Sequence, residues 1–461
     1  MKLNKLKFLL IFLAAIFFAQ GANALVLTHP EYDNMAVDED GIFFSGKISK
    51  HEKVYIDGVR ITPAKTGAFS YSVPLNQGEN IFAVQSKDWL GNNTTKKYVI
   101  TRIIPTKNSD KFIKTEKAYY KTVRDNVVLR STPVDGGINR LGYLSKDTKV
   151  VVEGNFNEFA GIYLTKNTYG WVLAKDLVKT EDEEVCYTPI DLTDTDQFKT
   201  DKDITYTFTC SDNMPYSATV NDNKLVLTLY NLDKQEEKYA KEFKLDKFPR
   251  YSICVQNGIL YLTFKKLPFS QSNYSNKKVN IVIDPGHGGY ETGAVGCLGH
   301  KEKDLNLEVA LKLKKILEEH NYNVKMTRET DKFVSLNDRI KFAQDEDALI
   351  FISIHQNSVP ISKNPNLNEG TAVFYFNPQS HELATAVSKS VSQSLGVKNE
   401  GAVQASFAVI RPTEYVGILA ELIYLVNQND VAVYKNKKFA QTSAMAIYKG
   451  LSSYIHSELE K

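Results

Sequence analysis

The sequence predicts a multidomain protein in which all-β modules precede a C-terminal α/β domain with a mostly parallel sheet. At 461 residues the chain is too long for one ordinary core, so roughly two to four domains are expected. Short strand-like runs separated by Gly and Asn turns fill the chain as far as Lys278. Beyond Lys278, apolar strand-like runs alternate with helical patterns, which is typical of layered α/β domains.

Composition and net charge indicate a folded protein that is not a dedicated nucleic-acid binder. Hydrophobic residues make up 43% and charged residues 24%, the balance of a folded protein. The formal net charge of +3 is small for this length, whereas a dedicated nucleic-acid binder carries a strongly basic patch or stripe. No nucleic-acid partner is therefore expected.

Residues 1–24 have the pattern of a secretory signal peptide. Three lysines precede the unbroken apolar stretch Phe8–Ala19, and Ala22-Asn23-Ala24 follows as a small-x-small cleavage site. The apolar stretch is shorter than the roughly 20 residues of a spanning helix, so an uncleaved anchor is the weaker alternative. We expect a protein exported to the periplasm, the cell wall or the medium, with no stable membrane insertion after cleavage.

The cysteines suit an exported protein but identify no site. Cys186, Cys210, Cys254 and Cys297 form no C-x-x-C pair, so neither a cysteine zinc site nor a redox motif is expected. Export permits disulfides, but the pairing of the first three cysteines cannot be read from the sequence.

Residues 25–105 predict a β-sandwich, because short strand-like runs such as Ile81–Val84 alternate with turn signals such as Asp57-Gly58. The pattern Gly67-x-Phe69, Gly78-x-Asn80 and Asp88–Asn92 resembles the immunoglobulin-like modules of bacterial surface proteins. The polar stretch that follows, up to about residue 111, is expected to be a linker.

Residues 112–182 predict a second β module. It begins with Asn126–Pro133 and closes with Tyr169–Val172, an order that resembles bacterial SH3-like domains, small barrels that often bind cell-wall peptides. Tyr169 and Trp171 could offer a stacking surface. The sequence nevertheless favours a place for Trp171 in the core, which aromatic residues dominate in a barrel this small.

Residues 186–272 predict a third β-rich module, with strand-like runs at Lys224–Tyr230 and Gly258–Phe264. Its place just before the α/β domain suggests wall targeting, although the sequence does not identify what it binds. The segment Ser270–Lys278 is rich in Ser, Asn and Lys, a composition typical of linkers.

Residues 278–458 predict the α/β domain. Val279–Ile283, Ala348–Ile354 and Ile418–Leu422 are short apolar runs of the kind found in buried strands. Between them, Leu305–Leu317 and Leu383–Leu395 carry apolar residues at helical spacing. Strands that alternate with helices favour a largely parallel sheet.

Four residues in this domain form a candidate catalytic set. His287 and His355 each follow a predicted strand, and functional groups gather at the carboxyl ends of parallel strands. With Glu302, just before the first helix, they make the two-histidine, one-carboxylate set of a catalytic zinc with one open position. Glu421, at the end of another strand, stands where a general base would. Individually, each could be an ordinary structural residue.

The domain carries an ordered series of motifs: Val282–Gly289, Gly293–Gly296, Lys301–Leu307, Thr327-Arg328, Leu336-x-x-Arg339, Ser353-Ile354-His355-x-Asn357, Ile410-Arg411 and Leu419–Leu422. Through this series the domain resembles the type 3 family of zinc-dependent N-acetylmuramoyl-L-alanine amidases. The resemblance implies that His287, Glu302 and His355 bind Zn²⁺ and that Glu421 is the catalytic carboxylate. Asn357 and Arg411 are further candidates for holding the substrate.

The implied function is hydrolysis of the amide between N-acetylmuramic acid and L-alanine of peptidoglycan, in wall remodelling or daughter-cell separation. Another zinc peptidase of similar fold and a non-catalytic wall-binding protein remain alternatives. The β modules, residues 25 to about 270, are expected to localise the enzyme. The path from His355 to Glu421 leaves no segment over for an inhibitory plug, so no activator protein is expected, although the loop Pro360–Glu369 could act as a lid.

Overall fold

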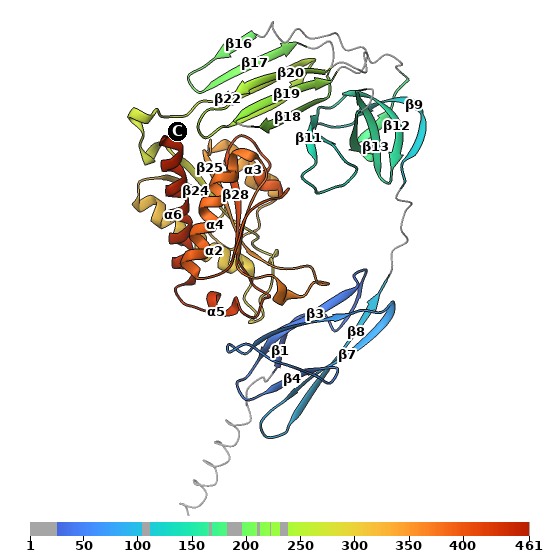
Figure 1. Cartoon of the computed structure of the whole chain (residues 1–461), viewed down its shortest axis with the longest axis vertical. Helices are drawn as coiled ribbons and strands as arrows, with labels where there is room; N and C mark the ends of the chain where they lie inside the picture. The colour runs from blue at the N-terminus through green and yellow to red at the C-terminus, as the bar shows by residue number, and fades with distance from the viewer. Residues whose placement is uncertain are drawn as a thin grey trace, which may run out of the picture.

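The computed structural model describes residues 25–103, 111–165, 168–181, 196–209, 213–221, 223–230 and 238–460 (Figure 1). The predicted signal peptide, most of the first linker, Cys186 and Cys210 lie outside the described residues. Of the remaining cysteines, Cys254 is exposed and Cys297 is buried, and neither forms a disulfide within the described part of the chain. None of the described helices is both long and apolar enough to cross a membrane.

The N-terminal module, residues 25–103, consists of two sheets around one core. Its strands are β1 (Leu25–His29), β2 (Asn34–Val37), β3 (Gly41–Ile48), β4 (Lys53–Ile56), β5 (Val59–Ile61), β6 (Ala68–Pro74), β7 (Gly78–Lys87) and β8 (Asn93–Arg102). The sheets have the orders β1-β3-β6 and β2-β8-β7-β4-β5. Phe44, buried between them, packs edge-on against Phe82 and Tyr98. Alternating apolar residues of facing strands thus build a small, aromatic core.

The second module, residues 111–181, is one strongly bent run of strands. Its elements are β9 (Ile113–Thr122), β10 (Val127–Arg130), β11 (Arg140–Leu144), β12 (Lys149–Phe156), β13 (Phe159–Thr165), β14 (Thr168–Leu173), η1 (Ala174–Asp176) and β15 (Leu177–Lys179), in the sheet order β11-β10-β14-β13-β12-β9-β15. Val172 is fully buried, whereas its neighbour Trp171 is half-buried and contacts Phe112 edge-on. The expectation that Trp171 belongs to the core is therefore wrong, because it lies outside the buried core of this module.

The third module, residues 196–269, stacks two further sheets. Its strands are β16 (Asp196–Lys199), β17 (Asp203–Thr209), β18 (Tyr216–Asn221), β19 (Lys224–Tyr230), β20 (Lys238–Lys244), β21 (Tyr251–Gln256) and β22 (Ile259–Lys265), in the orders β16-β17-β22-β21 and β18-β19-β20. Its core continues into the second module through Val151 and Tyr163. The two modules are therefore packed together rather than joined only by a linker.

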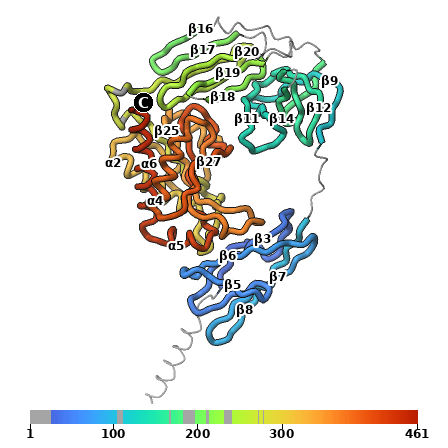
Figure 2. The backbone as a smooth tube through the Cα atoms, viewed as in Figure 1, coloured from blue at the N-terminus to red at the C-terminus, as the bar shows by residue number. Residues whose placement is uncertain are grey.

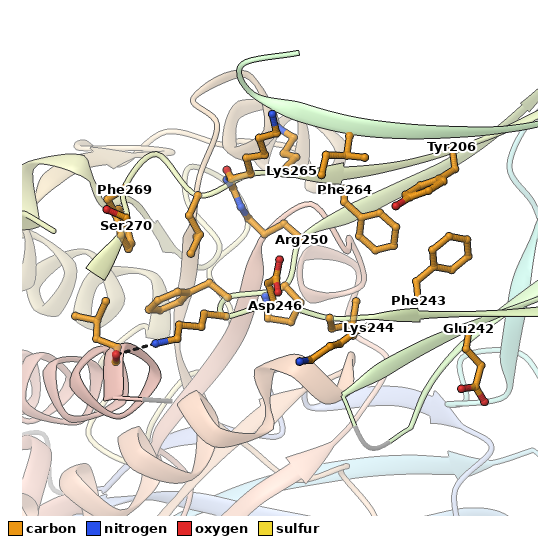
Figure 3. Close-up of a pocket in the computed structure, with 18 of the residues that line it drawn as sticks. Tyr206, Glu242, Phe243, Lys244, Asp246, Arg250, Phe264, Lys265, Phe269 and Ser270 are labelled. Atoms are coloured by element: carbon orange, nitrogen blue, oxygen red, sulfur yellow. Dashed lines mark hydrogen bonds between the residues drawn. The ribbon is translucent and has the colours of Figure 1, made fainter. Parts of the chain in front are cut away.

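A cavity of about 820 Å³ opens between the two sheets of the third module. Figure 3 shows Tyr206 and Phe264 on one sheet facing Phe243 on the other. Leu459, near the end of the chain, completes the wall. Because no predicted site residue lines this cavity, it is separate from the candidate active site.

The C-terminal domain, residues 279–460, is a six-stranded sheet covered by helices on both faces (Figure 2). Two short 3-10 helices, η2 (Gln271–Asn273) and η3 (Asn276–Lys278), lead into it. Its elements are β23 (Asn280–Pro285), α2 (Glu302–Glu319), β24 (Asn323–Met326), α3 (Leu336–Asp345), β25 (Ile350–Asn357), η4 (Pro365–Leu367), β26 (Thr371–Tyr375), η5 (Pro378–Ser380), α4 (His381–Leu395), β27 (Asn399–Gln404), η6 (Ala408–Ile410), β28 (Val416–Tyr424), α5 (Val431–Tyr434) and α6 (Phe439–Glu460).

The sheet order is β24-β23-β25-β28-β26-β27, and all neighbours pair in parallel except β26 and β28. Successive strand residues point to opposite faces, so Ile281 and Ile283 join the core under α2, α4 and α6, while Val282 joins the core under α3. This explains why the strands read as continuous apolar runs. The prediction of a β-rich N-terminal region followed by an α/β domain is confirmed.

The third and N-terminal modules contact the C-terminal domain at opposite ends of its strands. Arg250 of the third module forms an ion pair with Asp347, at the amino end of β25, with 3.1 Å between nitrogen and oxygen. Ser70 of the N-terminal module contacts Val426, beyond the carboxyl end of β28. The eight residues of β25 place these two strand ends about 26 Å apart at the usual rise per residue.

Candidate active site

Three adjacent parallel strands bring the predicted residues to one edge of the sheet. His287 lies two residues after β23, His355 lies near the end of β25, and Glu421 lies in β28. His355 and Glu421 are direct partners in the register of β25 and β28. The sequence prediction that these side chains gather at the carboxyl ends of the strands therefore agrees with the geometry.

The loop after β23 needs two of its glycines to bring the histidines together. A Cβ atom on Gly286 would lie 2.2 Å from the ring of His355, too close for any side chain. Gly293 has φ +65°, and a Cβ atom there would lie 2.4 Å from Oε2 of Glu302. His287 itself has φ +59°, a backbone conformation that costs non-glycine residues about 1–3 kcal/mol and is concentrated at functional sites.

Glu302 is the first residue of α2, is only 4% exposed and forms the centre of the cluster. Its Oε1 lies 2.8 Å from Nδ1 of His355 and 3.3 Å from Nε2 of His287. Its Oε2 accepts a hydrogen bond from the amide of Ala294 at 2.8 Å. A carboxylate at a helix N-terminus also interacts favourably with the helix dipole, so the charge is stabilised locally.

The donor set fits a metal ion. One ligand atom each from His287, Glu302 and His355 lies within 4.8 Å of the others. Burial alone would raise the pKa of the Glu302 carboxyl, but hydrogen bonds from the two histidines outweigh burial and hold that pKa well below its usual range. The side chains of His287 and His355 are 31% and 16% exposed, so the cluster is open to solvent on one side. Two imidazoles, one carboxylate and an open side suit catalytic zinc.

Glu421 is the second carboxylate of the site. Its side chain is buried, and Oε2 has no hydrogen-bond partner among the described residues. Burial raises the pKa of the Glu421 carboxyl well above its ordinary value, and the negative charge of Glu302 raises it further. The arrangement therefore provides one carboxylate that stays ionised and one that can hold and release a proton.

A buried ion pair that sequence reasoning missed supports the His287 loop. Nη1 of Arg339 donates to Oδ1 of Asp284 at 2.6 Å, and both side chains are almost fully buried. Nη1 also donates to the carbonyl of Pro285, and Nη2 donates to the carbonyl of His287, each at 2.8 Å. Arg328 donates to the carbonyls of Pro285 and Gly286, each at 2.9 Å. The two guanidinium groups thus fix the backbone that presents His287.

Two amides that sequence reasoning also missed surround Glu302. Asn306, one helical turn after Glu302, donates from Nδ2 to Oε1 of Glu302 at 3.3 Å. Nε2 of Gln356 donates to Oδ1 of Asn306 at 3.3 Å, and the backbone amide of Gln356 donates to Oε1 of Glu302 at 3.2 Å. The i, i+4 spacing of Glu302 and Asn306 was the available signal, because it puts both on one helix face.

The two candidate substrate contacts have different positions. Asn357 is half-buried at the end of β25, two residues beyond His355, and its Oδ1 accepts from the amide of Ser358 at 2.9 Å. Arg411 precedes the amino end of β28, on the other edge of the sheet, and its Nε donates to Oγ of Ser406 at 3.0 Å. The structure therefore brings Asn357 to the cluster but does not bring Arg411 there.

Comparisons with known proteins agree with this geometry. Residues 281–453 match the model of the N-acetylmuramoyl-L-alanine amidase family. The probable cell wall amidase LytH of Staphylococcus epidermidis is 37% identical over 196 residues, 41% of this chain and 64% of that protein. YqiI of Bacillus subtilis is 32% identical over 191 residues, 41% of this chain and 90% of that protein.

Among solved structures, the catalytic domain of CwlV, an N-acetylmuramoyl-L-alanine amidase from Bacillus (Paenibacillus) polymyxa, has 33% identity. The match covers 39% of this chain and 98% of that one, with a TM-score of 0.37. The chain spans less than two thirds of the length of its LytH relatives, and the matched region is its C-terminal domain. The matched region includes His287, Glu302, His355 and Glu421, and through it the chain belongs to the N-acetylmuramoyl-L-alanine amidase family.

Proposed function

We propose that this protein is an exported, zinc-dependent amidase that hydrolyses the bond between N-acetylmuramic acid and L-alanine in peptidoglycan. The observation that carries the proposal is the cluster of His287, Glu302 and His355 beside the buried Glu421, whose Oε2 finds no partner among the residues that the structure describes. Family membership supplies the reaction class, and the signal-peptide pattern of residues 1–24 supports export.

His287, Glu302 and His355 would hold the ion. A bound zinc ion would polarise the scissile carbonyl and lower the pKa of water to about 7. The chain contributes the orientation of these ligands. Asn306 and the amide of Gln356 fix Glu302, and Arg339 fixes the backbone of His287. Such outer contacts stop the ligands from rotating away when no substrate is present.

Glu421 would move the proton. Its Oε2, which has no hydrogen-bond partner in the described part of the chain, can accept a proton from the attacking water, because burial and the charge of Glu302 raise the pKa of the carboxyl well above its ordinary value. The same group would then return the proton to the departing amine of L-alanine. A buried position keeps this proton from exchanging with bulk solvent during the reaction.

The two alternatives differ from this proposal in ways that can be measured. A zinc carboxypeptidase would use the same three ligands but release a C-terminal amino acid. A wall-binding protein without activity would need no second carboxylate, yet Glu421 is buried at a considerable desolvation cost. The retained Glu421 and the family match favour hydrolysis of the muramoyl amide.

The experiment uses the mature full-length protein and a soluble N-acetylmuramoyl-pentapeptide. Hydrolysis should release free pentapeptide and N-acetylmuramic acid, should stop after zinc is removed with a chelator, and should return when zinc is added back. Release of terminal D-alanine alone would favour the carboxypeptidase, and wall binding without any product would favour the non-catalytic alternative.

A further inference from the structure

The N-terminal module contacts loops next to the candidate active site through one buried serine. Ser70, in β6, is 3% exposed, and its Oγ donates to the carbonyl of Val426 at 2.6 Å. The Sγ of Cys297 lies 3.4 Å from the same Oγ. The Nδ2 of Asn366 donates to the backbone carbonyl of Ser70 at 2.9 Å. These partners are hundreds of residues away in the sequence, so the contact is purely tertiary.

The three partners of Ser70 come from the three loops that carry or follow the site residues. Cys297 lies in the segment between His287 and Glu302. Asn366 lies in the loop after His355, and Val426 lies five residues after Glu421. Cys297 is fully buried, and burial raises the pKa of its thiol to about 11, so the thiol stays protonated and can donate to Val426.

The loop Pro360–Glu369 is held from two sides. Within the C-terminal domain, Nδ2 of the fully buried Asn427 donates to the carbonyls of Pro365 and Asn368, at 3.2 and 2.8 Å. On the other side, Ile361 packs against the core of the N-terminal module, and Oγ of Ser72 donates to the carbonyl of Lys363 at 3.3 Å. The sequence suggested a lid here, but these contacts describe a loop clamped between two domains.

We propose that Ser70 is a positioning residue for the amidase reaction, and that the N-terminal module shapes the rim of the active site. This inference rests on the proposed function. It replaces part of the sequence-based expectation that residues 25 to about 270 only localise the enzyme. The side chain of His287 is 31% exposed, so the module does not cover the metal cluster.

Loss of the Ser70 contact should weaken substrate binding at the rim of the active site. His355 and Glu421 are held within the sheet, so loosening the loops beside them should leave the chemical step largely intact. Ser70 takes part in at least two hydrogen bonds across the contact, so its replacement should separate the two domains. The freed loops would no longer hold the substrate in place, so KM should rise roughly tenfold or more while kcat changes by less than about threefold.

The test compares full-length variants on the soluble N-acetylmuramoyl-pentapeptide, which needs no wall targeting. Ser70→Arg inserts a charge into the buried contact, and Asn366→Asp replaces the donor to the Ser70 carbonyl by an acceptor at nearly constant size. Thr95→Arg, on an exposed position of β8, is the matched control. Both contact variants should show the rise in KM, faster amide hydrogen exchange in residues 358–370 and unchanged zinc content, whereas the control should match the wild type.

The proposal is overturned if Ser70→Arg and Asn366→Asp bind zinc, show faster exchange in residues 358–370 and yet keep the wild-type KM. If Ser70→Arg does not fold, Asn366→Asp with a wild-type KM overturns it alone. A wild-type protein that carries zinc but does not cleave the muropeptide would instead overturn the proposed function, and this inference with it.

Discussion

Replacement of Arg339 by lysine tests how the His287 loop is held. Arginine uses a rigid fork to reach Asp284 and the carbonyls of Pro285 and His287 together, whereas lysine offers a single ammonium group. Arg339→Lys should keep the charge opposite Asp284 but lose at least the bond to His287. A buried carbonyl left without its donor costs about 1–3 kcal/mol.

This cost should appear mainly as weaker zinc binding, because the lost bond fixes the backbone of a zinc ligand. Contacts that orient metal ligands typically contribute roughly 10- to 100-fold to metal affinity, the range expected for Arg339→Lys. The assay is competition for zinc with a chelator of known affinity, followed by activity at saturating zinc, where most of the rate should return. Lys341→Ala is the control, because it breaks an exposed pair with Asp345 on the same helix, worth at most about 1 kcal/mol.

The reasoning about Arg339 would be refuted by a zinc affinity within about twofold of the wild type. An equal loss in Lys341→Ala would also refute it, since it would point to general weakening of α3 rather than to the loop.

Three further predictions concern the site itself. His355→Ala should abolish hydrolysis and lower zinc content, because it removes one of the three proposed ligands; normal zinc stoichiometry measured by elemental analysis would contradict the assignment. Glu421→Gln should keep zinc and circular dichroism but lose activity roughly 100-fold or more in a steady-state assay, and a near-normal rate would move the proton-transfer role elsewhere. The full-length protein should cleave the soluble muropeptide without any added partner, since His287 is partly exposed; silence until a second protein is added would reveal an inhibitory contact.

The arrangement of the site could be predicted because its residues follow apolar strands. Runs of buried β-branched residues located the strand ends, and parallel pairing then brought His287, His355 and Glu421 to one edge. Arg411 shows where this reasoning stops. It also neighbours a strand, but it precedes β28 instead of following it, so it lies at the other edge. The sequence does not reveal that β26 and β27 run antiparallel to β28, which brings the loop after β27 to the amino end of β28.

The supporting contacts were beyond sequence reasoning for a different reason. Arg339 and Asp284 belong to motifs that carry the family resemblance, but only the folded structure shows that both are buried and paired. The contact of Ser70 with Val426 spans 356 positions and joins two domains, so no periodicity or spacing reports it. Trp171 illustrates the same limit, since its exposure depends on how the strands of the second module curve.

The central claim is tested most directly by hydrolysis of purified peptidoglycan in water enriched in oxygen-18. The zinc-loaded full-length protein should place the label in the lactyl carboxylate of muramic acid and leave an unlabelled stem peptide with a free L-alanine amine, as read by mass spectrometry of the products. Label in the terminal carboxylate of the peptide, or in a carboxylate released by cleavage between other residues, would contradict the assignment of this protein as a muramoyl amidase.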